Sequence, residues 1–164
     1  MIDPLGAAYI VDVVKAGADV FGLLVAVQAI GGILGGLLAG KVGERVRTSR
    51  LYGWAEIILA ILMALRYNIP EIPILFVMTL LVGFPAALGI AALETLFQRN
   101  VPNTHLGRIS GVLNSTVGIT SLFGVLGISG VLGETVGIVP VLNIAAGITM
   151  LTGIIALLFL PQEA

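Results

Sequence analysis

The stretch GGILGGLLAGKVGERVRTSR, residues 31–50, decides how the rest of this chain is interpreted. It joins the glycine-rich end of an apolar run to a short loop that carries Lys41, Arg45, Arg47 and Arg50. Nearly chargeless sequence of helix length lies on both sides of the loop, as expected where a cytoplasmic loop joins two membrane-spanning helices. Its glycines would let a neighbouring helix approach closely.

The composition predicts an integral membrane protein. Of the 164 residues, 58% are hydrophobic and only 10% are charged, whereas roughly a quarter of the residues of a soluble domain are charged. So few charged residues cannot form a polar surface. The long runs rich in Leu, Ile, Val and Gly are typical of helices, because barrel strands alternate polar and apolar residues in short segments. We therefore predict an all-α protein.

Residue types exclude several kinds of site. The chain has no cysteine, which excludes disulfides, cysteine metal sites and a thiol nucleophile. Its single histidine, His105, has no cysteine or second histidine nearby, so we expect no metal site. The net charge of -1 gives no indication of a nucleic-acid partner. We find no Walker-type glycine loop and no catalytic constellation, and so expect neither a cofactor nor an enzyme.

Five apolar runs are long enough to span a bilayer, which takes roughly 20 residues. Asp19 is a candidate N-cap of the first run. We expect the five full transmembrane helices at about residues 20–40, 51–67, 72–97, 109–132 and 136–160. They form the predicted transmembrane bundle of residues 19–164.

Residues 1–18 contain too little uninterrupted apolar sequence for a span, because Asp12 and Lys15 break it. This segment is either a partial, interfacial helix or the tail of a truncated helix at the extracytoplasmic face. We favour the truncated helix, and the start at Met1 is abrupt under this interpretation.

The basic residues predict the orientation. Two fall on one side of the predicted bundle, Lys15 and Arg66, and the larger group should mark the cytoplasmic side. That group consists of Lys41, Arg45, Arg47, Arg50, Arg99 and Arg108. The N-terminus would then lie outside and the C-terminus in the cytoplasm.

Small residues and a proline mark features within the spans. Gly31, Gly35 and Ala39 recur every fourth residue, and a second such series follows one residue later. Each series would form a ridge for close helix packing. In the third span, Gly83 and Pro85 form either a gating hinge or a static kink, because proline removes a helical hydrogen bond.

Two loops resemble those of the major facilitator superfamily. Residues 36–45, GLLAGKVGER, resemble the family's signature loop, in which a glycine and three variable residues precede an acidic residue, a basic residue, a variable residue and a glycine. Gly40 stands at the acidic position, a departure usual in the weaker second-half copy of the loop. Residues 97–111, FQRNVPNTHLGRISG, are similar to the loop between the tenth and eleventh helices of bacterial exporters of this family, including macrolide and siderophore exporters.

The resemblance covers nearly the whole chain but only half of the family's twelve-helix fold. It implies that the residues before Ala18 are the tail of helix seven and that the five full spans are helices eight to twelve. It also implies the C-terminal part of an exporter in the inner (plasma) membrane, which moves a small amphipathic molecule out of the cell by alternating access. The implied partners are the lipid bilayer, the small-molecule substrate, and the missing N-terminal half or a second copy.

Two alternatives stay open beside the exporter. The chain could be a half-size membrane protein that works as a dimer, which restored export by a defined dimer would reveal. It could also be a non-transporting scaffold or a degenerate fragment, which would insert stably without binding substrate or partner.

The resemblance further implies that the third span lines the central path, with the first and fourth spans beside it and the second and fifth as outer supports. The candidate residues lining the path are Gln28, Asn114 and Thr116. Hydrogen bonds between helices are the alternative role for these polar side chains.

A cytoplasmic gate is expected around the signature loop. Glu94 could pair with Arg45 and Arg108 to hold one state closed, although topogenic charge and headgroup contact would also explain the two arginines. The residues of the loop motif and gate are Gly36, Gly40, Lys41, Gly43, Arg45, Glu94 and Arg108.

The sequence indicates no acidic residue that would bind a transported proton. We expect no acidic residue near the midpoint of a span, so an acid that couples transport to protons would lie in the missing half. Glu56 is placed about one turn inside the second span, where both a pairing with the basic loop and a transport role are open.

Overall fold

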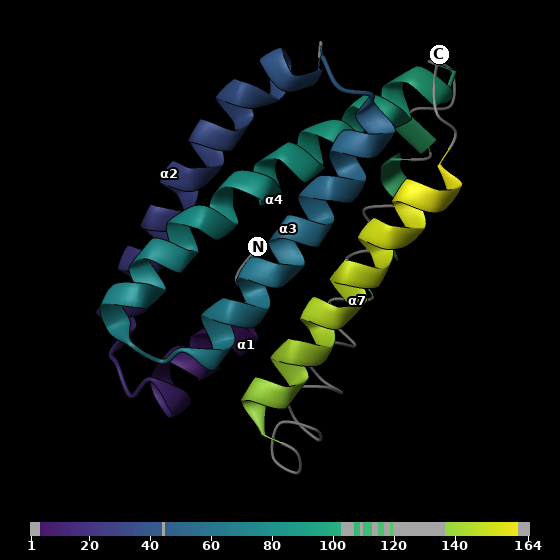
Figure 1. The fold of residues 1–164 in the computed structure, drawn as a ribbon. Helices are drawn as coiled ribbons and strands as arrows, with labels where there is room; N and C mark the ends of the chain where they lie inside the picture. The colour runs from purple at the N-terminus through teal and green to yellow at the C-terminus, as the bar shows by residue number, and fades with distance from the viewer. Residues whose placement is uncertain are drawn as a thin grey trace.

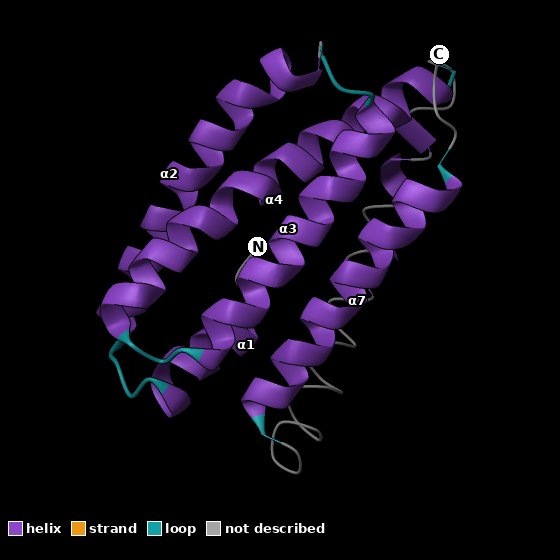
Figure 2. Ribbon diagram, in the orientation of Figure 1, coloured by secondary structure: helices purple, strands orange, loops and turns teal. Residues whose placement is uncertain are grey.

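The computed structural model describes residues 4–43, 45–102 and 137–160, together with residues 107, 108, 110–112, 115, 116 and 119. All secondary-structure elements in this part of the chain are helical (Figure 2). The elements are α1 (Pro4–Ala8), a short π-helix η1 (Tyr9–Val13), α2 (Ala18–Gly43), α3 (Thr48–Asn68), α4 (Ile72–Asn100) and α7 (Ile138–Phe159).

Four of the described helices, α2, α3, α4 and α7, are long and apolar enough to cross a membrane. They correspond to the first, second, third and fifth predicted spans, which confirms an all-helical membrane protein. The expected count of five is matched only roughly, because most of the predicted fourth span, residues 109–132, lies outside the described residues.

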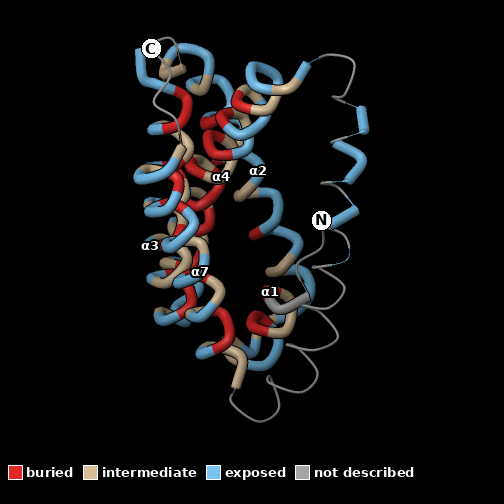
Figure 3. The backbone as a smooth tube through the Cα atoms, turned by 90° about the vertical axis from the view of Figure 1, so that its right-hand side faces the viewer, coloured by how far each residue is buried: buried red, intermediate tan, exposed pale blue. Residues whose placement is uncertain are grey.

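The long helices pack side by side in an order that differs from their order in the chain (Figure 1). α4 lies between α2 and α3, and α3 lies between α4 and α7. Figure 3 shows buried residues along the facing sides of the helices and exposed residues on their outer sides. The outer sides are strongly apolar, with Leu37 71% exposed and Phe159 78% exposed. Apolar outer faces of this kind fit a lipid environment.

Glycines bring the backbones of α2 and α4 into direct contact. A Cβ atom on Gly31 would meet the carbonyl oxygen of Leu80, and one on Gly35 would meet that of Phe84. From the other side, a Cβ on Gly83 would lie 2.9 Å from the backbone nitrogen of Gly32. The predicted close packing is thus confirmed for the ridge that contains Gly31 and Gly35.

Glycine also permits the crossing of α3 and α7. A Cβ on Gly153 would lie 2.8 Å from the carbonyl oxygen of Gly53. Near the other end of this crossing, Asn68 Nδ2 donates to Asn143 Oδ1 at 2.9 Å. The two side-chain amides thereby join α3 to α7 by a hydrogen bond.

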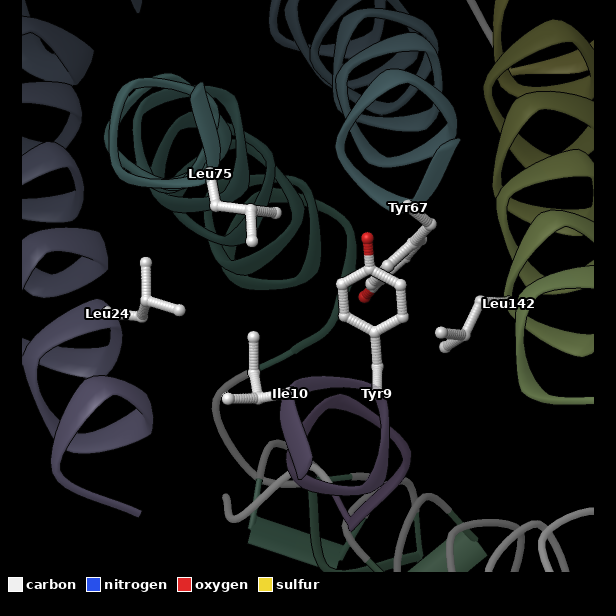
Figure 4. Close-up of a cluster of buried hydrophobic side chains, with 6 residues drawn as sticks. All are labelled: Tyr9, Ile10, Leu24, Tyr67, Leu75 and Leu142. Carbon is white, nitrogen blue, oxygen red and sulfur yellow. The ribbon is translucent and has the colours of Figure 1, made fainter. Parts of the chain in front are cut away.

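The first helical segment fills one end of the bundle. Tyr9 and Ile10 of η1 are fully buried, and Figure 4 shows them pointing into the space between the long helices. Leu24, Tyr67, Leu75 and Leu142 meet them there, one from each of α2, α3, α4 and α7. The identity of residues 1–18 as the tail of a truncated helix stays a prediction.

Candidate functional site

A cavity of about 790 Å³ lies between α2, α3 and α4. Its volume falls within the range of about 300–1,000 Å³ that is usual for small-molecule sites. The lining is mainly apolar, with Val82 and Ile90 from α4 and Leu59 and Met63 from α3. This mixture of apolar surface and a few polar side chains suits an amphipathic molecule.

Two of the residues singled out from the sequence meet at this cavity. Gln28 of α2 is half-buried and lines it, and Gly83 of α4 lies beside it. The packing is direct, because a Cβ on Gly83 would also meet the carbonyl oxygen of Gln28. Of the other path candidates, Asn114 lies outside the described residues. Thr116 is exposed, and its hydroxyl donates to the carbonyl of Val112 at 2.8 Å, so its hydrogen-bonding capacity serves its own helix turn.

The proposed hinge lies in the same helix wall. α4 continues from Ile72 to Asn100 through Pro85, and both Gly83 and Pro85 are buried. Proline has no backbone N–H, so the carbonyl of Leu81 lacks its usual helical partner. A bend at this point would alter the cavity wall, but gating at Pro85 stays a prediction.

A second, smaller cavity of about 310 Å³ lies at the end of the bundle that carries the signature loop. Gly40 and Gly43 line it together with Thr48, Thr95 and Arg99. Arg99 Nη1 donates to Thr48 Oγ1 at 3.4 Å, which joins the C-terminal end of α4 to the start of α3. The structure therefore gathers the basic ends of α2, α3 and α4, as the assignment to one side of the membrane requires.

The remaining gate candidates lie on the surface. Gly36, Lys41, Arg45, Glu94 and Arg108 are all exposed. Within the described residues, no ion pair links Glu94 to either arginine. Their action as a gate stays a prediction, and it would belong to a different conformation from the one described.

The Major Facilitator Superfamily model matches residues 1–164. The chain belongs to the major facilitator superfamily. Members of this family are transporters rather than enzymes, so membership implies a transporter of the major facilitator type. Comparison with curated proteins and with solved structures gave no match.

One charged residue in this major facilitator bundle was missed as a site. The charge pattern assigns Arg66 to the extracytoplasmic side of the bundle. In the structure, its side chain is only 7% exposed and lines the larger cavity. Its guanidinium carbon lies 5.5 Å from the centre of the Tyr67 ring. A charge within the apolar span, next to an aromatic residue, was the available signal. Tyr9, which is 57 residues away in the sequence, donates its hydroxyl to the backbone carbonyl of Arg66.

Glu56 lies deeper than the sequence indicated. α3 begins at Thr48 rather than near Leu51, so Glu56 is the ninth of its 21 residues. It is half-buried, its Oε1 lies 3.3 Å from the Cβ position of Gly89, and its Cβ lies 3.0 Å from that of Gly153. The expectation that no acidic residue lies near the middle of a span is therefore wrong for α3. The error arose because the loop before α3 is shorter than the charge pattern indicated.

Proposed function

We propose that this chain forms the C-terminal part of a secondary active transporter that exports a small amphipathic molecule. The observation that carries the proposal is the cavity of about 790 Å³ between α2, α3 and α4. Its apolar walls can hold an apolar body, while Gln28 offers a donor and an acceptor on one side. A largely apolar site with few polar groups is what such a molecule requires.

Alternating access would expose this cavity to each side of the membrane in turn. The break in hydrogen bonding at Pro85 lets α4 bend next to the cavity, and Gly83 holds α2 against the same part of the helix. The exposed charges Arg45, Glu94 and Arg108 would close the cytoplasmic end when the helices rotate. In this proposal the end with the signature loop faces the cytoplasm and the N-terminus lies outside, in the inner (plasma) membrane.

A second helical bundle must complete the path, because alternating access needs two bundles that rock against each other. We propose an N-terminal half as this bundle, with a second copy of the chain as the alternative. Crosslinking in native membranes distinguishes the two, because a second copy would give a product of twice the chain's mass.

Efflux from cells tests the proposal. Cells that lack their own efflux pumps and express the native gene product are loaded with cationic, neutral and anionic amphipathic dyes. We expect at least one dye to leave faster than from cells without the gene, and ionophores that collapse ion gradients to abolish the difference. Gln28→Ala should slow this efflux, because it removes the polar contact in the cavity.

Gln98→Ala is the matched control. Gln98 is an exposed glutamine near the end of α4 and does not line the cavity, so its replacement should leave efflux unchanged. Equal efflux with and without the gene for every dye would contradict the proposed function. Equal efflux by Gln28→Ala and the parent protein would contradict the assignment of the path to this cavity.

A further inference from the structure

We propose that Arg66 binds an oxyanion group of the transported molecule, so that the substrate is an amphipathic organic anion. This inference rests on the proposed function and specifies the substrate class of the same cavity. The ligand would carry a carboxylate, sulfonate or phosphate group attached to an apolar body.

Arg66 has unused hydrogen-bonding capacity. The side chain is 7% exposed, and its buried Nε has no hydrogen-bond partner among the described residues. The ring of Tyr67, at 5.5 Å from the guanidinium carbon, is a weak partner for the charge. Burying a cation without a hydrogen-bonded counter-ion is costly. A ligand that supplies the counter-charge would therefore bind with a large electrostatic advantage.

None of the described residues that line the cavity is acidic. Among the described residues that line it, Arg66 is the only charged one. The cavity is therefore positive at the Arg66 end, and its low-dielectric walls strengthen attraction to an anion. Planar guanidinium donors match the two oxygens of a carboxylate or of a tetrahedral oxyanion.

The rest of the cavity defines the remainder of the ligand. Met63 lies one turn before Arg66 in α3, and Val82, Ala86 and Ile90 of α4 add apolar surface. Gln28 supplies a second polar contact from α2. The ligand would thus carry one charged group, an extended apolar part and a further hydrogen-bonding group.

The position of Arg66 is fixed by its neighbours. The Tyr9 hydroxyl donates to the backbone carbonyl of Arg66 at 3.3 Å. The rings of Tyr9 and Tyr67 meet edge to face, with centroids 5.4 Å apart and planes at 78°. Figure 4 shows the two side chains next to each other. This packing holds the end of α3 in one place, so less ordering entropy is lost on binding.

A matched pair of probes tests the inference without transport. The native gene product is purified in a phosphate-free nonionic detergent, and binding of tritiated 2-naphthoate and of its uncharged analogue 2-naphthamide is measured by equilibrium dialysis against detergent alone. We expect the carboxylate to bind about tenfold or more tightly than the amide, since hydrogen bonds between charged groups are the strong ones. Equal binding of the two probes would overturn the inference without any variant.

Variants then test whether Arg66 is the residue that binds the carboxylate. Arg66→Gln should weaken naphthoate binding to the level of the amide, and Arg66→Lys should retain part of it. Arg50→Gln is the control, because Arg50 is exposed at the opposite end of the same helix. Unchanged naphthoate binding by a folded Arg66→Gln or Arg66→Lys protein would overturn the inference.

A phospholipid headgroup is the other source of the same chemistry. Dihexanoyl phosphatidylglycerol is therefore added as a competitor beside unlabelled 2-naphthoate. Stronger displacement by the phospholipid would assign Arg66 to a lipid and overturn the assignment to a transported anion. Efflux of cationic or neutral dyes through a cavity that binds no anion would contradict this inference and leave the proposed function intact.

Discussion

At the scale of single residues, the absence of a side chain determines how closely the helices approach. Gly31 lies against the carbonyl of Leu80, where any Cβ atom would clash with backbone. Gly36, five residues later in the same helix, has no described atom within 4 Å of its Cβ position. The two glycines share a helix and a residue type, but only Gly31 is required for packing.

This contrast gives a stability prediction. Gly31→Ala should lower the free energy of unfolding by about 1–3 kcal/mol, because the backbones of α2 and α4 must separate to admit the methyl group. Gly36→Ala should leave stability unchanged or raise it by up to about 1 kcal/mol, since alanine favours helix more than glycine does. The midpoint of thermal unfolding in detergent measures both. Equal midpoints for the two variants would show that the contact at Leu80 does not hold the helices together.

Sequence spacing could predict this glycine contact but not which series makes it. The series that contains Gly31 and the series that contains Gly36 are offset by one residue, and each has the four-residue period. Which ridge packs depends on the rotation of α2 about its axis, and that is set by α4. The burial of Arg66 could not be predicted for a similar reason, because it depends on how the helices pack and not on the local sequence.

At the scale of elements, α4 connects the two packed pairs of helices and carries the residues with the clearest mechanical role. It contacts α2 through Gly83 and α3 through Gly89. Pro85 lies between these two contacts and is buried. A bend at Pro85 would therefore move the α2 contact relative to the α3 contact, and the cavity between these helices would change shape.

The hinge at Pro85 can be tested against another proline in the same helix. Pro85→Ala restores an N–H that can bond to the carbonyl of Leu81, so α4 should stiffen and efflux should slow several-fold. Pro73→Ala is the control, because Pro73 lies in the first turn of α4, where proline interrupts no helical hydrogen bond. Initial efflux rates of the two variants are compared at equal protein levels. Equal rates would indicate a static kink.

Element positions were predicted better than their ends. Each of the four described long helices overlaps its predicted span, because long apolar runs have one stable solution in a bilayer. α3 extends three residues further toward its N-terminus than predicted. Thr48 and Ser49 are buried in this extra turn, and Arg99 donates to Thr48. A contact with another helix, which hydropathy does not report, accounts for the difference.

At the scale of the whole molecule, the apolar outer surface and the gathered basic ends suit a bundle held in a bilayer. Most of the basic residues lie at one end, because α2 and α4 end there and α3 begins there. The charge pattern predicted this arrangement. It could not predict the cavity of about 790 Å³. The cavity walls come from α2, α3 and α4, and the order of these helices in space differs from their order in the chain.

Cysteine accessibility tests whether the cavity beside Gln28 is the transport path. The chain has no cysteine, so Gln28→Cys carries a single thiol. A charged, membrane-impermeant methanethiosulfonate reagent is added to sealed right-side-out and inside-out vesicles. Leu37→Cys is the control, since Leu37 lies on the same helix and is 71% exposed on the apolar outer side of the bundle.

We predict that the Gln28→Cys thiol reacts in vesicles of both orientations, because alternating access opens the cavity to each side in turn, and that Leu37→Cys reacts in neither. Failure of Gln28→Cys to react from both sides, or reaction from one side only under every condition, would contradict the assignment of the transport path to this cavity.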